Sequence, residues 1–170
     1  EMRQLVDIGF KQYSESVNNF IKTRYAYQII RLTHYLKDFN GTITLYDSLI
    51  THLNSQSIIK YWALSHKAGA LWSIGEYAQS SYTFSKIFDE CLSKRLLAEQ
   101  NFKINEASLL NETLELCQNN HEKAVLWFLH SYNNNDMRGL KRIYELEPES
   151  AYLEVLLTRA IENLEEDIFI

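Results

Sequence analysis

The stretch ALWSIGEYAQSSYTFSKIF, residues 70–88, carries the clearest structural pattern in this chain. Aromatic and small side chains alternate in it around one break, Gly75-Glu76-Tyr77. Apolar residues recur at every third or fourth position on both sides of that break, which is the period of an α-helix. The break is therefore either a turn between two packed helices or a loop with a chemical role.

A second stretch favours the turn. KDFNGTITLYDSLI (37–50) superposes on GEYAQSSYTFSKIF (75–88), and a weaker third copy fits RGLKRIYELEP (138–148). The matched positions are Asp38 with Glu76, Phe39 with Tyr77, Tyr46 with Phe84, Leu49 with Ile87, and Ile50 with Phe88, while Leu140, Ile143 and Tyr144 take the places of Phe84, Ile87 and Phe88. A repeat of this length is typical of stacked helical hairpins. It predicts that Tyr77 and Phe84 both lie in the core.

The helical period continues through the rest of the chain, and no run alternates as a strand would. Short connections between the helices predict antiparallel hairpins within one all-α domain, residues 1–170. Expected helix-capping residues are Asn18 or Asn19, Ser93, Asn105, Asn119 (with Glu122 at capping-box spacing) and Ser150, and Pro148 is expected to stop a helix. About ten helices are predicted, over 2–13, 20–37, 41–53, 57–74, 76–91, 94–102, 106–118, 121–133, 136–146 and 151–166.

The composition limits the classes of function. The chain has 170 residues, a net charge of −5, only five glycines and one proline. Its 17 lysines and arginines are dispersed, which argues against nucleic-acid binding. It contains no apolar run long enough for a membrane helix, so we expect no membrane insertion and a soluble protein of the cytoplasm or periplasm. Cys91 and Cys117 lie in apolar periodic segments and are expected to be buried free thiols rather than a disulfide.

No set of catalytic or metal-binding residues is recognisable. HEKAV (121–125) begins like a zinc-protease helix, but Val125 stands where the second histidine ligand is required. The chain has no glycine-rich phosphate loop and no serine in a nucleophile-elbow context. The acidic run IENLEEDIFI (161–170) is typical of a solvated helical face. We therefore expect no enzyme activity, no cofactor and no metal.

The motif IGEYAQSSYTFSKIF resembles the tetratricopeptide repeat, whose second helix opens with a Gly-Asp-Tyr turn and ends before a proline. Ser80 takes the position that this family usually fills with alanine, and Pro148 has the spacing of its closing proline. The chain departs from the family in its repeat offset of 38 residues instead of ~34, and residues 92–118 fit poorly. It also looks like large bacterial helical-repeat proteins. The resemblance implies a right-handed superhelix of stacked hairpins, either complete or a segment of a longer chain.

In that family the first helix of each hairpin lines a concave groove. Carried over to this chain, the groove positions are Arg24, Tyr27, Arg31, His34 and Tyr35, followed by Trp62, Ser65, Gly69, Trp72 and Ser73. These side chains are interpreted either as a polar and aromatic binding surface or as core between repeats with solvated arginines beside it. The lysines and asparagines of the family's carboxylate clamp are not reproduced at these positions.

The expected function is therefore a non-enzymatic protein-interaction or scaffolding module that holds a protein or peptide partner in its groove. The alternative is a helical domain that binds a glycan or another planar ligand on Trp62, Trp72 and the tyrosines. A third interpretation is that the aromatic residues only stiffen a solenoid whose binding site lies elsewhere. The oligomeric state is left open.

Overall fold

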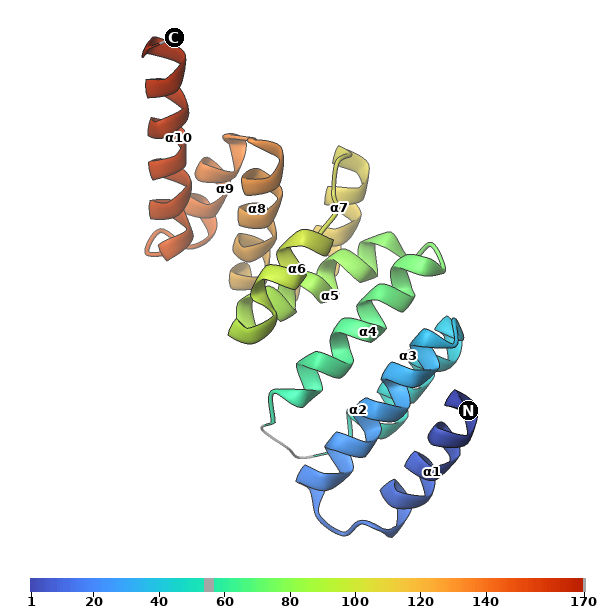
Figure 1. The fold of residues 1–170 in the computed structure, drawn as a ribbon. Coiled ribbons are helices and arrows are strands. Elements are labelled where there is room, and N and C mark those ends of the chain that lie inside the picture. Colours follow the sequence, from blue (N-terminus) through green and yellow to red (C-terminus); the bar gives the residue numbers. More distant parts are fainter. Residues whose placement is uncertain (54–56, 170) are drawn as a thin grey trace.

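The computed structural model describes residues 1–53 and 57–169, and every regular element within them is helical (Figure 1). The elements are α1 (Met2–Glu15), α2 (Asn19–Tyr35), α3 (Phe39–Leu49), α4 (Ile59–Ser73), α5 (Tyr77–Glu90), the 3-10 helix η1 (Leu92–Lys94), α6 (Arg95–Asn101), α7 (Ala107–Glu115), α8 (Asn120–Asn134), α9 (Arg138–Leu146) and α10 (Ala151–Phe169). The all-α prediction and its ten helices are confirmed for this part of the chain.

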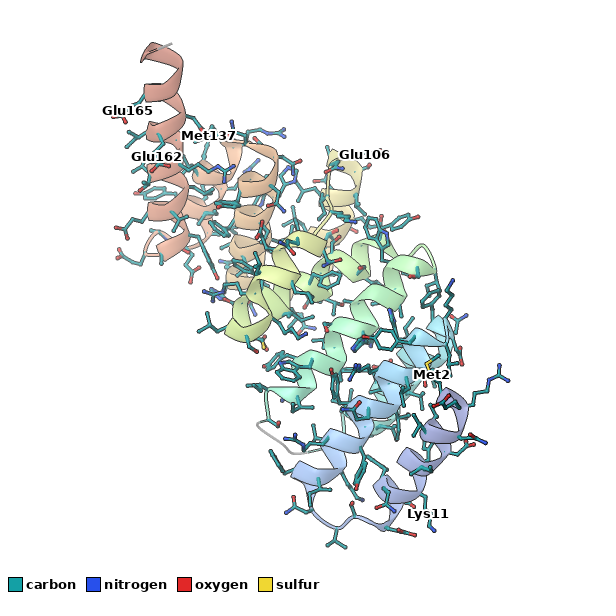
Figure 2. The ribbon with its side chains drawn as sticks, in the orientation of Figure 1. Met2, Lys11, Glu106, Met137, Glu162 and Glu165 are labelled. Atoms are coloured by element: carbon teal, nitrogen blue, oxygen red, sulfur yellow. The ribbon has the colours of Figure 1, made fainter. Side chains whose placement is uncertain are left out.

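The helices pack mainly on their neighbours along the sequence, and the molecule is elongated (Figure 1). The helices α2 and α3, and likewise α4 and α5, run in opposite directions, while α2 also contacts α4 directly. Figure 2 shows Met2 and Lys11 on α1 at one end of the molecule and Glu162 and Glu165 on α10 at the other. Among the described residues, no helix is both long enough and apolar enough to cross a membrane.

Most helix ends lie within three residues of their predicted positions, because the capping residues act as expected. The side chain of Asn18 accepts a hydrogen bond from the Phe20 amide, and that of Asn119 accepts one from the Glu122 amide. The Glu122 carboxylate accepts from the Gln118 amide in return, one residue before the capping-box position. These contacts satisfy amides that have no partner within the helix.

Two predicted capping residues are wrong, although both helices begin within one residue of the predicted start. Helix α7 has Glu106 as its N-cap, without a side-chain hydrogen bond, instead of Asn105. The segment after Cys91 begins as the 3-10 helix η1 and becomes α-helical only at Arg95, so Ser93 caps nothing. The Ser93 hydroxyl instead accepts a hydrogen bond from the indole nitrogen of Trp62, at 3.2 Å.

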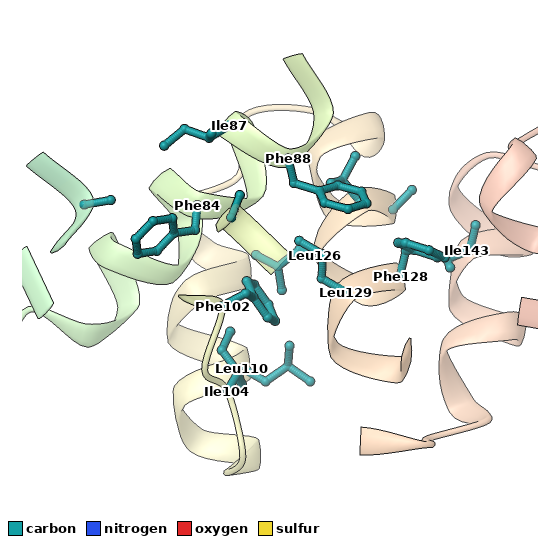
Figure 3. Close-up of a cluster of buried hydrophobic side chains, with 14 of the residues drawn as sticks. Phe84, Ile87, Phe88, Phe102, Ile104, Leu110, Leu126, Phe128, Leu129 and Ile143 are labelled. Atoms are coloured by element: carbon teal, nitrogen blue, oxygen red, sulfur yellow. The ribbon is translucent and has the colours of Figure 1, made fainter. Parts of the chain in front are cut away.

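The core forms two clusters of unequal size. The larger one extends from α4 to α10 and contains Phe84, Phe102 and Leu126 (Figure 3). The smaller one lies between α2, α3 and α4 and is built on Ala26, Ile30, Ile50 and Ala63. Cys91 is buried, Cys117 is partly buried, and both are free thiols. The N-terminal third of the chain therefore has much less buried apolar volume than the rest.

The repeat alignment predicted burial correctly at some positions only. Phe84, Ile87 and Ile143 are buried, with exposed fractions of 3%, 0% and 0%. Tyr77 is 46% exposed and Tyr144 is 64% exposed, so the expectation that Tyr77 fills the core is wrong. Tyr77 is the first residue of α5, where its ring packs against Trp72, with 4.6 Å between the ring centroids, instead of entering the core.

Three glycines occupy positions that other residues would disturb. Gly75, in the turn between α4 and α5, has φ +92°, which L-residues rarely adopt. A Cβ at Gly9 would lie 2.8 Å from Ile29, and one at Gly139 would lie 2.7 Å from the Cβ of Ser131. Glycine therefore permits the close approach of α1 to α2 and of α9 to α8.

Polar contacts join elements that are distant in the sequence. The His121 ring lies between Asp89 and Glu147, with nitrogen-to-oxygen distances of 3.0 and 3.1 Å. The Tyr152 hydroxyl donates to the other oxygen of Asp89, at 2.9 Å. These contacts tie α5, α8 and the start of α10 together around one carboxylate.

Candidate binding groove

Eight of the ten residues predicted for the groove line two adjoining cavities. The first cavity measures about 370 Å³ and includes Arg24, Tyr27 and Trp62. The second measures about 490 Å³ and includes Tyr27, Arg31, His34 and Tyr35. Tyr27 borders both cavities, so together they form one continuous depression, which we call the α2–α4 groove.

The groove is lined chiefly by three elements that lie on the near side of the molecule in Figure 1. Helix α2 carries Tyr27, Arg31 and His34 at helical spacing, which places them on one face. Helix α4 contributes Trp62 to the first cavity, and Ser65, His66 and Gly69 to the second. The segment η1–α6 adds Lys94, Leu97 and Asn101, again at helical spacing.

Aromatic rings of α2 and α4 contact one another and form part of the groove wall. The ring centroids of Tyr27 and Trp62 are 5.9 Å apart with an edge-to-face geometry, and Tyr27 lies equally far from His66. His66 in turn lies 5.2 Å from His34 and 5.9 Å from Tyr35. Edge-to-face pairs of this kind stabilise the packing beyond their buried area. The groove wall is therefore a preformed aromatic surface.

Some of these aromatic residues belong partly to the core and also line the cavities. Tyr27 packs on the smaller core cluster and Trp62 on the larger one, so each contributes to the core with part of its surface. Tyr35 is 53% exposed and belongs to the surface. The same rings therefore hold the hairpins together and face the groove.

Three cations of the groove lie over aromatic rings instead of pairing with carboxylates. Arg24 lies 5.5 Å from the Phe20 ring centroid, Arg31 lies 5.5 Å from that of Tyr35, and Lys94 lies 5.4 Å from that of Trp62. No ion pair among the described residues includes these three cations. No aspartate or glutamate lines either cavity in the described part of the chain. The groove is thus locally basic in a chain of net charge −5.

The two histidines of the groove are held neutral. Burial, and after it the neighbouring His34, Lys94 and Arg31, lower the pKa of His66 to about 4. Burial also lowers the pKa of His34. The Nδ1 atom of His34 is buried and has no hydrogen-bond partner among the residues that the structure describes. A Cβ at Gly69 would lie 3.3 Å from the His34 ring, so glycine leaves room for it there.

Trp72 lies apart from the other predicted groove residues. It lines neither cavity, its ring packs at a tilt of 57° against that of Tyr77, and Lys103 lies 5.4 Å from its centroid. The resemblance led to this position because Trp72 occupies a groove-facing position of the family on the first helix of its hairpin. The structure places η1–α6 beside α4, and this segment brings Lys94 to Trp62.

Sequence reasoning missed His66 and the residues of η1–α6. His66 directly follows Ser65 and was not one of the family's groove positions. Lys94, Leu97 and Asn101 lie in the region that fits the repeat poorly, although their spacing of three and four residues could have shown that they share a face. The available signal was a predicted helix, 94–102, that follows a clear hairpin but belongs to no repeat.

Among the described residues, no group of three or more histidines, cysteines, aspartates or glutamates is arranged to hold a metal ion. Comparisons of the chain with protein-family models, with curated proteins and with solved structures find no significant match. The site is therefore interpreted from its own geometry.

Proposed function

We propose that this chain is a non-enzymatic interaction module that holds a segment of a partner protein in the α2–α4 groove, within a right-handed, tetratricopeptide-like stack of hairpins. The observation that carries the proposal is the meeting of eight predicted residues in one continuous groove. Arginine and large aromatic side chains dominate the binding energy of protein interfaces, and the groove is rich in both. Cavities of this size are in the range that takes up ligand groups or anchor side chains.

Affinity capture from a lysate of the organism that encodes the chain tests this proposal. The bait is compared with an Arg24→Ala/Arg31→Ala variant and with an Arg3→Ala/Arg142→Ala control, whose arginines lie outside the groove on α1 and α9. We expect a partner that is retained by the wild type and the control but lost from the groove variant. Equal recovery with all three baits would show that binding does not use the groove.

A second candidate function is the binding of a glycan or another planar ligand. It is favoured by the half-buried rings of Tyr27 and Trp62, which meet edge to face beside the first cavity. Titration of the tryptophan fluorescence with a glycan panel tests it, with Trp62→Phe as the variant and Trp127→Phe as the control. A signal that saturates and disappears in Trp62→Phe alone supports this function, and a flat response to the whole panel counts against it.

A further inference from the structure

We infer that the α2–α4 groove selects an acidic peptide segment, one whose aspartate or glutamate side chains reach Arg31 and Lys94 while its apolar side chains pack against Tyr27 and Trp62. This inference rests on the proposed function and names the chemistry of the partner. It depends on the charges and rings around the groove, including Lys94, which the resemblance did not indicate.

The cations of the groove are complementary in charge to an acidic segment. Arg24, Arg31 and Lys94 border a groove without carboxylates, although the chain as a whole is acidic. Six of the other fourteen lysines and arginines form ion pairs within the described structure, as Lys67 does with Asp47 and Lys86 does with Glu122. An anionic segment would therefore find unpaired cations here, and basic segments would be repelled.

The cations of the groove are held in place before a partner binds. Each groove cation lies over a ring, which restrains the side chain without neutralising its charge. Trp62 is fixed by its hydrogen bond to Ser93, and Lys94 is the next residue, so ring and cation keep their places together. A restrained cation loses less conformational entropy when a carboxylate binds it.

The two cavities of the groove differ in the chemistry of their lining. The first cavity is bordered by Ile21, Tyr25 and Ile59 besides the two aromatic rings, so its wall is mostly apolar. The second cavity carries Arg31, Lys94, Asn101 and two histidines. An anchor side chain fits the first cavity and carboxylates fit the second, which favours a peptide over a free small anion.

Selection from a displayed library of random dodecapeptides tests the inference, with the purified chain as bait. The groove variant is Arg31→Gln/Lys94→Gln, and the matched control is Arg3→Gln/Lys141→Gln, which removes two cations outside the groove. Circular dichroism and thermal unfolding confirm that both variants are folded. We expect the peptides enriched by the wild type to be rich in aspartate and glutamate. The groove variant should bind the best of them at least about tenfold more weakly, because two charge-assisted hydrogen bonds are lost.

The outcomes separate the inference from the proposed function. Affinity that falls with added salt, is lost in the groove variant and is kept in the control supports the inference. Enrichment of neutral or basic peptides that still need Trp62 would overturn the inference and leave the interaction module standing. Enrichment of acidic peptides that bind the groove variant as well as the wild type would also overturn it. A library from which nothing is enriched would contradict both.

Discussion

Single residues in this chain have effects that depend on which side of a helix they occupy. Phe84 and Tyr77 belong to the same repeat motif and the same helix, yet only Phe84 enters the core. The sequence pattern identified both as motif positions. It could not show that the first residue of α5 packs sideways onto Trp72, because that contact depends on how α4 ends.

The pair gives a direct test of this difference in burial. Phe84→Ala should lower the free energy of unfolding by about 3–5 kcal/mol, because it empties a buried volume. Tyr77→Ala should lower it by only about 1 kcal/mol, since the ring is 46% exposed and loses mainly its contact with Trp72. Chemical denaturation of the two variants measures both values. Similar losses in the two would mean that the repeat alignment, and not the observed packing, describes α5.

His66 should make the fold sensitive to acid. Its pKa is lowered to about 4 in the folded chain, whereas an unfolded histidine titrates near 6.5. Between these values the unfolded chain binds a proton that the folded chain does not, so the free energy of unfolding decreases as the pH falls from about 6.5 to about 4. The contribution is roughly 2–3 kcal/mol over that range.

Denaturation curves at pH 7 and pH 4.5 measure this contribution. His66→Gln should lose less stability between the two pH values than the wild type does, and His52→Gln, on the turn after α3, should behave as the wild type. All three proteins contain the same carboxylates, so the contribution of these groups to the pH dependence cancels in the comparison. An unchanged pH dependence in His66→Gln would show that the ring is solvated.

At the scale of elements, local signals placed the helices well where caps or the repeat marked them. Asn18 and Asn119 make their predicted N-cap hydrogen bonds, and α9 ends before Pro148. After Cys91 the helix was predicted correctly but its cap was not, because the repeat does not extend there and a 3-10 helix precedes α6. The same failure explains the missed part of the groove, because the placement of η1–α6 depends on tertiary contacts such as that of Trp62 with Ser93.

The crossing of α8 and α9 should tolerate no side chain at residue 139. A Cβ there would lie 2.7 Å from the Cβ of Ser131 and 3.2 Å from the carbonyl oxygen of Trp127, and both atoms belong to helix α8. Gly139→Ala should therefore lower the free energy of unfolding by about 1–3 kcal/mol, although alanine favours helix formation. Lys141→Ala, on the exposed side of α9, is the control and should change stability by about 0.5 kcal/mol or less. A stabilised Gly139→Ala would show that the two helices lie further apart.

At the scale of the whole molecule, stability should be distributed unevenly. The larger core cluster joins α4 to α10, whereas α1 packs mainly on α2 and the smaller cluster has only four buried members. In stacked helical proteins each unit is stabilised by its neighbours, so an end unit with few of them opens most easily.

Native-state hydrogen exchange measures this gradient. We expect the amides of α1 to be the least protected among the long helices, followed by those of α2 and α3, while α5 and α8 exchange only on global unfolding. Ile30→Ala should accelerate exchange in α1–α3 without affecting α8, and Leu126→Ala should accelerate it throughout α5–α10. Uniform protection along the chain would indicate a single cooperative unit.

The neighbour-to-neighbour packing also bears on how the chain reaches its fold. Nearly every helix contact joins elements close in the sequence, and the bond from Tyr152 to Asp89 is among the few that reach further. Low contact order is associated with fast folding, because little loop entropy is lost before native contacts form. Hairpins such as α4–α5 could form first and add their neighbours one at a time. Assembly of this kind is compatible with co-translational folding, because each hairpin can form before the C-terminal helices have been synthesised.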